Sequence, residues 1–350
     1  MRVFERLDEL YAIGGGPGAI RLHGSREEDE AHKLAATWLE EAGLSVEVDA
    51  DGNLFGHARV PQSVEKVSDT GSSGAVWVGS HLDTVPQGGR FDGALGVVAA
   101  IEAVERAGAG SVVVFRGEEV GCVGSRALVA RGHGLPAAFL ELHVEQGPVL
   151  ADAGAPLGVV TSIVGYARGE LVFEGRAGHA GTTPMTSRDD ALVAAAQAVL
   201  GIRDAAAGIE GAVATVGQLE LEPGGSNVIP SRVRISVDAR APDAERLGAL
   251  VAAIGFGFSP HQRTEPVAMD VGLRTFLRES IERADHPAVD LSSGAGHDAG
   301  ILAAAGVPSA MLFVRSLNGG VSHSPEELSS DDDVLLATEV LVDTVRRLTA

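Results

Sequence analysis

Short apolar runs that alternate with helical segments constrain the fold of this chain more than any other feature. Each run has the length of a buried strand, and together they cover residues 75–79, 111–115, 137–142 and 309–314. The segments 93–107 and 124–130, which lie between these runs, are predicted as helices. Strands that alternate with helices predict an α/β domain with a mostly parallel sheet and helices on both of its faces.

The order of the predicted elements changes after Gly165. Strands are predicted over 168–173, 212–221 and 232–240, and helices over 189–206 and 242–254. This order is typical of a small α+β unit with an antiparallel sheet. We therefore expect a first domain of residues 1–165 and 276–350, interrupted by a smaller domain of residues 166–275. Within the first domain, the polar, Ser-rich residues 61–74 are predicted to form a loop.

The net charge of the chain limits the kinds of molecule that this protein is expected to bind. The 350 residues include 48 acidic and 27 basic side chains, which gives a net charge of −21. Nucleic acids and anionic membranes both attract clustered Lys and Arg, so neither is expected as a partner. The single cysteine, Cys122, excludes an intramolecular disulfide. We find neither a signal-peptide core nor an apolar stretch long enough to span a membrane, so a cytoplasmic location is expected.

Histidines and carboxylates gather where the predicted elements end. Of the 11 histidines, the ones in such segments are His81, His143, His179, His297 and His323. The others are predicted at the surface, such as His23, His32 and His133. His81 and Asp83 end a buried strand at i and i+2, so both side chains lie on one face. A carboxylate beside an imidazole commonly fixes the tautomer that binds a metal, although His-x-Asp alone is more often a polar loop.

Two adjacent carboxylates, Glu118 and Glu119, follow the buried run 111–115. The two negative charges repel each other unless a cation lies near. With a cation present, one carboxylate can bind the metal and the other can act as a general base. An isolated Glu pair is usually a surface pair, but the buried run before it makes exposure less favourable here. His143 and His323 follow two further strands. Ligands of open α/β sheets gather at the carboxyl ends of strands, and His, Asp and Glu without Cys suit Zn²⁺, Mn²⁺ or Co²⁺.

Seven motifs in a fixed order carry a family resemblance. They are GSHLDTVPQGGRFDGALGV, EE, ELHVEQGP, GHAGTTPM, GGSNVIP, SGAGHDA and SHSPEE. With them the chain resembles the M20-type metallohydrolases, in the branch of N-carbamoyl-L-amino-acid hydrolases, allantoate amidohydrolases and β-ureidopropionases. The resemblance extends from Arg6 to the last helix. Peptidases of the same superfamily carry an acidic residue where His143 stands, so His143 favours the carbamoyl branch over the alternative, a di-metal aminopeptidase or dipeptidase.

The resemblance implies a role for each matching residue. Two divalent metal ions, zinc or manganese with cobalt or nickel as further options, would be held by His81, Asp92, Glu119, His143 and His323. Glu118 would be the general base, Asp83 would orient His81, and His179 would reach the site of a partner subunit. The substrate-binding positions would be Asn227 and Arg240, together with Gln218 and His297. Without the resemblance, Asn227 would be a turn residue, Arg240 a surface arginine and His297 a polar residue beginning a helix.

The implied activity is metal-dependent hydrolysis of the C–N bond of a carbamoyl or ureido group in a small, carboxylate-bearing substrate. The inserted domain would act as a lid and would form a homodimer. Val120-Gly121-Cys122 follows the Glu pair, where the family usually has a glycine, and the segment from Glu119 to His143 is shorter than in the family. These departures concern the choice of substrate more than the metal ligands. A non-catalytic scaffold would have lost ligands, and each expected ligand is present.

Overall fold

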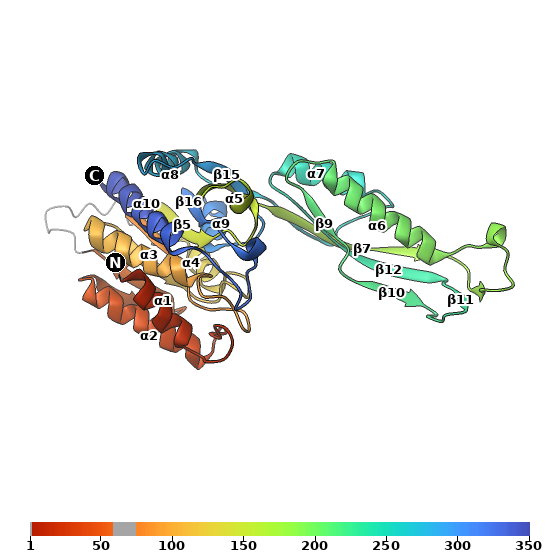
Figure 1. Cartoon of the computed structure of the whole chain (residues 1–350), viewed down its shortest axis with the longest axis horizontal. Helices are drawn as coiled ribbons and strands as arrows, with labels where there is room; N and C mark the ends of the chain where they lie inside the picture. The colour runs from red at the N-terminus through yellow and green to blue at the C-terminus, as the bar shows by residue number, and fades with distance from the viewer. Residues whose placement is uncertain (1, 59–74) are drawn as a thin grey trace. The chain divides into compact units, whose positions relative to one another are not determined.

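The computed structural model describes residues 2–58 and 75–350, so the predicted loop at 61–74 lies outside the described residues. The chain forms two compact units. One comprises Met1–Thr161 and Met269–Ala350, and the other comprises Ser162–Ala268. Figure 1 shows the helices and strands of each unit. None of the helices in the described ranges is long and apolar enough to cross a membrane.

The first unit is built on a mixed sheet whose centre is parallel. The four central strands are, in order, β4 (Ser111–Phe115), β3 (Val76–His81), β5 (Ala138–Val144) and β16 (Ser309–Val314). Each is parallel to its neighbour. At one edge β2 (Leu54–His57) and β1 (Ser45–Val48) continue the sheet beside β4, both antiparallel. At the other edge β6 (Leu157–Ile163) is antiparallel to β16, β14 (Val267–Ala268) is antiparallel to β6, and β15 (Val289–Ser293) also pairs with β6. The predicted fold class is therefore confirmed.

The two faces of this sheet have different neighbours, because side chains alternate along a strand. Val78, Val114, Leu142 and Leu312 belong to one apolar core. That core also contains residues of α1 (Val3–Ala12), α2 (Arg26–Glu41), α3 (Ala94–Ala107), α8 (Val271–Arg283) and α10 (Asp331–Thr349). The opposite face contacts α4 (Val123–Arg131) and α9 (Asp298–Ala304), and the short helix α5 (Val149–Asp152) follows β5. His81 and His143 have the opposite parity to the core residues and project from the second face.

The second unit is a five-stranded antiparallel sheet, counted in the part of the chain that the structure describes. Its strands are β10 (Leu219–Glu222), β12 (Arg232–Ala241), β7 (Gly165–Glu174), β13 (Gln262–Thr264) and β9 (Val213–Thr215), with β9 paired to β12. Two helices, α6 (Ala191–Ala207) and α7 (Ala244–Ile254), pack on the face that presents Val233, Ile235 and Val237. A separate two-stranded ribbon pairs β8 (Gly178–His179) with β11 (Val228–Ile229).

The structure corrects two details of the expected organisation. The run 212–221, expected as one strand, forms β9 and β10, which pair with different parts of β12. The insert ends earlier than 275, because the chain from Met269 onward packs with the first unit. The N–H of Asp270 donates to the carbonyl of Ser309, and Leu273 and Leu277 of α8 join the core of the large sheet.

A glycine sets how closely α3 lies to the sheet. A Cβ built on Gly96 would be 2.3 Å from the carbonyl oxygen of Leu142 and 2.6 Å from Cβ of Ser80. We expect Gly96→Ala to lower the free energy of unfolding by about 1–3 kcal/mol, since the overpacking falls on backbone that cannot swing away. Urea unfolding followed by circular dichroism measures this change.

Gly248 in α7 is the matched control, because a Cβ there would meet nothing within 4 Å. Gly248→Ala should raise stability by up to about 1 kcal/mol, through the better helix propensity of alanine. A Gly96→Ala protein as stable as the wild type would contradict the close approach of α3 to the sheet.

Candidate metal centre

Four neighbouring strands deliver the candidate ligands to one edge of the large sheet. His81 ends β3, His143 lies one residue before the end of β5, and the pair Glu118-Glu119 follows β4. His323 lies in the segment after β16. Because these four strands are parallel, their carboxyl ends meet at the same edge, where α/β sheets place their ligands.

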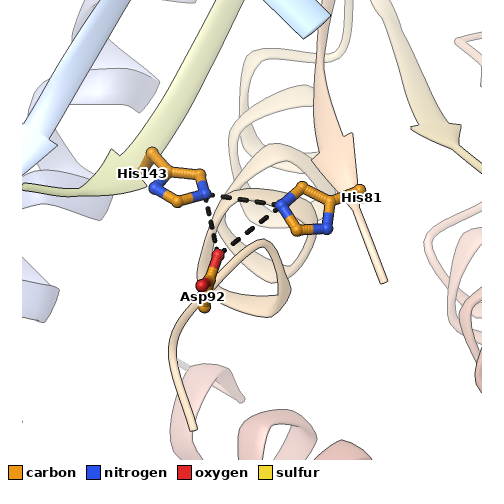
Figure 2. Close-up of side chains that lie close together, drawn as sticks. All are labelled: His81, Asp92 and His143. Atoms are coloured by element: carbon orange, nitrogen blue, oxygen red, sulfur yellow. Dashed lines mark hydrogen bonds and ion pairs between the residues drawn. The ribbon is translucent and has the colours of Figure 1, made fainter. Parts of the chain in front are cut away.

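The first group of candidate ligands is His81, Asp92 and His143, all of them buried. Nε2 of His143 lies 3.1 Å from Oδ1 of Asp92 and 3.5 Å from Nε2 of His81. Nε2 of His81 lies 3.6 Å from the same Oδ1. Figure 2 shows the three side chains converging. All three ligand atoms lie within 4.8 Å of one another, a separation that a single metal ion could bridge.

Backbone carbonyls fix the tautomer of both histidines. Nδ1 of His81 lies 3.1 Å from the carbonyl oxygen of Asp83, and Nδ1 of His143 lies 3.0 Å from that of Val144. A carbonyl oxygen only accepts, so Nδ1 carries the proton in each ring. In the neutral rings the two lone pairs are therefore on Nε2, the atoms that face each other and Asp92. This is the arrangement that metal-binding histidines adopt.

The second group shares Asp92 and adds Glu119 and His323. Nε2 of His323 lies 3.4 Å from Oδ2 of Asp92 and 3.4 Å from Oε2 of Glu119. Asp92 therefore turns one carboxylate oxygen to each group. The side chain of His323 is 49% exposed, whereas those of Asp92 and Glu119 are almost fully covered. The group lies at the edge of the buried region.

The pKa values reflect the crowding of charges in a buried space. Burial opposes ionisation of Asp92, but the imidazole of His143 holds the pKa of this carboxyl well below its usual range. Burial likewise works against the charged form of His143, and Asp92 nevertheless raises its pKa to about 9. Burial and the charge of Asp92 raise the pKa of Glu119. Glu119 therefore holds a proton more readily than a free glutamate does, and a divalent cation beside it would favour its charged form.

Glu118 lies beside both groups but belongs to neither. Its Oε2 is 3.8 Å from Nε2 of His81, and its Oε1 is 3.6 Å from Nδ1 of His297. Burial raises the pKa of Glu118 well above its ordinary value, although His81 acts in the opposite direction. The N–H groups of Glu118 and Glu119 donate to the two oxygens of Asp83, at 3.0 and 3.1 Å. Asp83 thus holds the Glu pair as well as His81, whose Nδ1 is 3.4 Å from Oδ1.

Of the expected substrate residues, His297 lies in this centre. It is buried, its ring centroid is 4.5 Å from that of His143, and its Nε2 lies 3.0 Å from the hydroxyl of Ser293. His32, expected at the surface, is instead buried in α2, where burial and then the charge of Arg116 lower its pKa to about 3.

The remaining expected residues lie in the second unit, at different places. His179 is exposed on the β8–β11 ribbon, and its Nδ1 accepts from the N–H groups of Gly181 and Thr182. The carbonyl of Asn227 accepts from the N–H of Ala180, so Asn227 lies beside His179. Gln218 is exposed between β9 and β10.

Arg240 lies at the other end of the small sheet. It pairs in register with Tyr166 near the start of β7, whereas the ribbon follows the Glu174–Arg232 pair at the opposite end. From Arg232 to Arg240 the strand β12 spans about 26 Å, at about 3.3 Å per residue. Within one chain, the structure therefore does not bring Arg240 together with Asn227 and His179.

Several polar residues of the centre, two of them buried and two partly exposed, were not identified from the sequence. Gln146 donates to Oδ2 of Asp92, Glu327 accepts from the N–H of Asp92, and Ser322 contacts both. Glu141 accepts from the hydroxyl of Ser80 and the N–H of Ala299. Gln146 belongs to the motif ELHVEQGP, and Ser322 and Glu327 belong to SHSPEE, so the motifs themselves were the available signal.

Known proteins resemble this chain over nearly its whole length. The N-carbamoyl-L-amino acid amidohydrolase of Geobacillus stearothermophilus is 36% identical over 416 residues, covering 99% of this chain and 98% of the relative. The allantoate amidohydrolase of Bacillus subtilis is 32% identical and covers 97% and 94%. A solved amidase of the hydantoinase/carbamoylase family from Burkholderia multivorans has a TM-score of 0.86 and 31% identity, covering 99% of this chain and 97% of that one.

The first alignment is longer than the 350 residues of this chain, so that relative carries segments that this chain lacks. Residues 77–347 match the peptidase family M20/M25/M40. The match includes the candidate ligands, and the family is metal-dependent. The resemblance seen in the motifs is therefore confirmed, and the chain belongs to the peptidase family M20/M25/M40.

Proposed function

We propose that this protein is a metal-dependent amidohydrolase that cleaves the C–N bond of a carbamoyl or ureido group in a small substrate carrying a carboxylate. The observation that carries the proposal is the pair of ligand groups that share Asp92, with the carboxylate of Glu118 beside them. His81, Asp92 and His143 would hold one divalent ion, and Asp92, Glu119 and His323 a second. The donors are nitrogen and oxygen only, which suits zinc or manganese, with cobalt or nickel also compatible.

The bound ions would supply Lewis-acid chemistry and a water of lowered pKa. Glu118 is the residue of this chain that moves the proton. It would take a proton from the attacking water and deliver it to the leaving nitrogen. Its raised pKa suits both steps, because burial weakens the preference of the carboxyl for its charged form. Asp83, through its bonds to the N–H groups of the Glu pair, would keep Glu118 directed at the centre.

Arg240 would bind the carboxylate of the substrate. Its guanidinium donates to both oxygens of Asp238, at 3.0 and 3.2 Å, and Arg168 donates to the same carboxylate at 2.8 Å. Asp238 therefore holds both guanidinium groups in place. A planar guanidinium also matches the geometry of a carboxylate.

His179 and Asn227 would act on the substrate from a second copy of the chain. The two N–H groups that donate to Nδ1 of His179 leave its proton on Nε2, so Nε2 is the atom that could donate to a developing oxyanion. The length of β12 keeps this pair from reaching a small molecule held by Arg240 of the same chain. This separation supports a homodimer in which the second unit lends His179 and Asn227 to the partner. Gln218 and His297 would complete the substrate site.

A substrate screen tests the reaction class. The purified protein, supplied with Mn²⁺ or Zn²⁺, should hydrolyse at least one of N-carbamoyl-L-amino acids, allantoate and β-ureidopropionate. Removal of metal with EDTA should abolish the activity, and either ion should restore it. Dipeptides form the comparison arm, because an M20 aminopeptidase or dipeptidase would cleave them instead. Activity on dipeptides alone would overturn the carbamoyl assignment, and activity that survives exhaustive chelation would overturn the metal assignment.

Glu118→Gln tests the proton transfer. The amide keeps the shape of the side chain but cannot accept a proton, so kcat should fall by about 100- to 10,000-fold. The metal content, measured by atomic emission, should stay at the wild-type value because Glu118 is in neither ligand group. A variant with near-normal kcat would remove Glu118 as the base.

Mixed dimers test whether His179 acts across the subunit boundary. Glu118→Ala and His179→Ala should each be inactive alone. When the two variants are co-expressed with different tags, random pairing should restore about one quarter of wild-type activity, because half of the dimers would contain one complete site. Activity that does not recover in purified mixed dimers would count against His179 acting in trans.

A further inference from the structure

A buried carboxylate outside both ligand groups joins the loops that carry Asp92 and His323. Glu327 is only 6% exposed. Its Oε2 accepts from the N–H groups of Phe91 and Asp92, at 2.7 and 3.1 Å, and its Oε1 accepts from the hydroxyl of Ser322 at 3.0 Å. One side chain therefore connects backbone positions that lie 235 and 236 residues away in the sequence.

The loop around Asp92 leaves a space for this carboxylate. A Cβ built on Gly89 would be 2.1 Å from Oε2 of Glu327 and 2.3 Å from its Cδ. Any side chain at position 89 would occupy the place where Glu327 enters. The buried position of the Glu327 carboxylate therefore requires a glycine at position 89.

Two further residues extend the connection to a third loop. The side-chain amide of Gln146, just after β5, donates to Oδ2 of Asp92 and to the hydroxyl of Ser322, both at 3.0 Å. Glu327, Ser322 and Gln146 together form what we call the loop clamp. It holds the segments after β3, β5 and β16 to one another through charge-assisted and neutral hydrogen bonds.

The sheet supports His323 less directly than it supports the two histidines of the first group. The histidines of the first group end strands and are fully covered, so the sheet positions them. His323 lies in a loop, is half-exposed and has a backbone φ of +54°. A non-glycine residue in that region is strained and persists when its surroundings hold it. The hydrogen bonds that could hold it include those of its neighbour Ser322 with Glu327 and Gln146.

We propose that Glu327 is a positioning residue that sets the geometry of the Asp92–Glu119–His323 group, and so the affinity of the second ion. This inference rests on the proposed two-ion function. Glu327 touches neither the ion nor the substrate; it acts through the backbone of Asp92 and through Ser322. Loss of such an outer partner typically lowers metal affinity by about 10- to 100-fold.

Calorimetric titration of the metal-free protein with Zn²⁺ tests the proposal without an activity assay. Glu119→Ala first identifies the binding step of the second group, because Glu119 belongs only to that group. Glu327→Ala should weaken the same step by about 10- to 100-fold and the other step by a smaller factor. Glu326→Ala, the exposed neighbour of equal charge, should bind both ions as the wild type does.

Two milder variants keep the test decisive if Glu327→Ala fails to fold, which circular dichroism would reveal. Ser322→Ala leaves both backbone bonds of Glu327 intact, and Glu327→Gln keeps one oxygen for them. Each should weaken the second step by less than Glu327→Ala would. Wild-type affinity for both ions in these variants, or an equal loss at both steps in Glu327→Ala, would overturn the role of Glu327. A wild-type protein that takes up fewer than two ions would overturn the two-ion function together with it.

Discussion

The buried carboxylate of Asp92 is the group on which the rest of the centre depends. Moving an ionised carboxylate out of water costs several kcal/mol unless charges and hydrogen bonds compensate it. Here His143 and His81 face one oxygen, and His323 and Gln146 face the other. Its N–H is satisfied by Glu327. These compensating groups come from three segments, at the ends of β3, β5 and β16, so the ionisation of a single side chain requires the assembly of this edge of the sheet.

The sheet can bring these groups together because one of its faces packs against helices and the other face carries the histidines. One face packs Val78, Leu142 and Leu312 against α3 and α10, which Figure 1 shows side by side. The other face carries His81 and His143 at neighbouring strand ends. Since side chains alternate along each strand, apolar packing and chemistry do not compete for the same positions. The close approach of α3 at Gly96 holds β3 and β5 firmly at the point where those histidines project.

Much of this could be predicted from local signals. β16 has the predicted bounds, Ser309–Val314, because a continuous apolar run needs only its own sequence to indicate a buried strand. The hydroxyl of Ser25 accepts from the N–H of Glu28 at the start of α2, and a bond between residues three apart depends only on local sequence. The end of the insert does not follow from local sequence, because α8 is an ordinary amphipathic helix and its contact with β16 and α10 decides to which unit it belongs. The burial of His32 does not follow either, because nothing local distinguishes a buried histidine from an exposed one.

The sequence by itself determined the fold class, the family and the residue types that end each central strand, since all of these follow from short-range patterns and ordered motifs. Only the tertiary structure decided which oxygen of Asp92 faces which group, and that Glu118 stands apart from both. It also decided that Arg240 lies near one end of β12 and Asn227 beyond the other end, and that Glu327 fills the space beside Gly89. These facts are distances between residues far apart in the chain. The pairing of strands and the packing of loops fix such distances. The order of the motifs along the chain does not specify them.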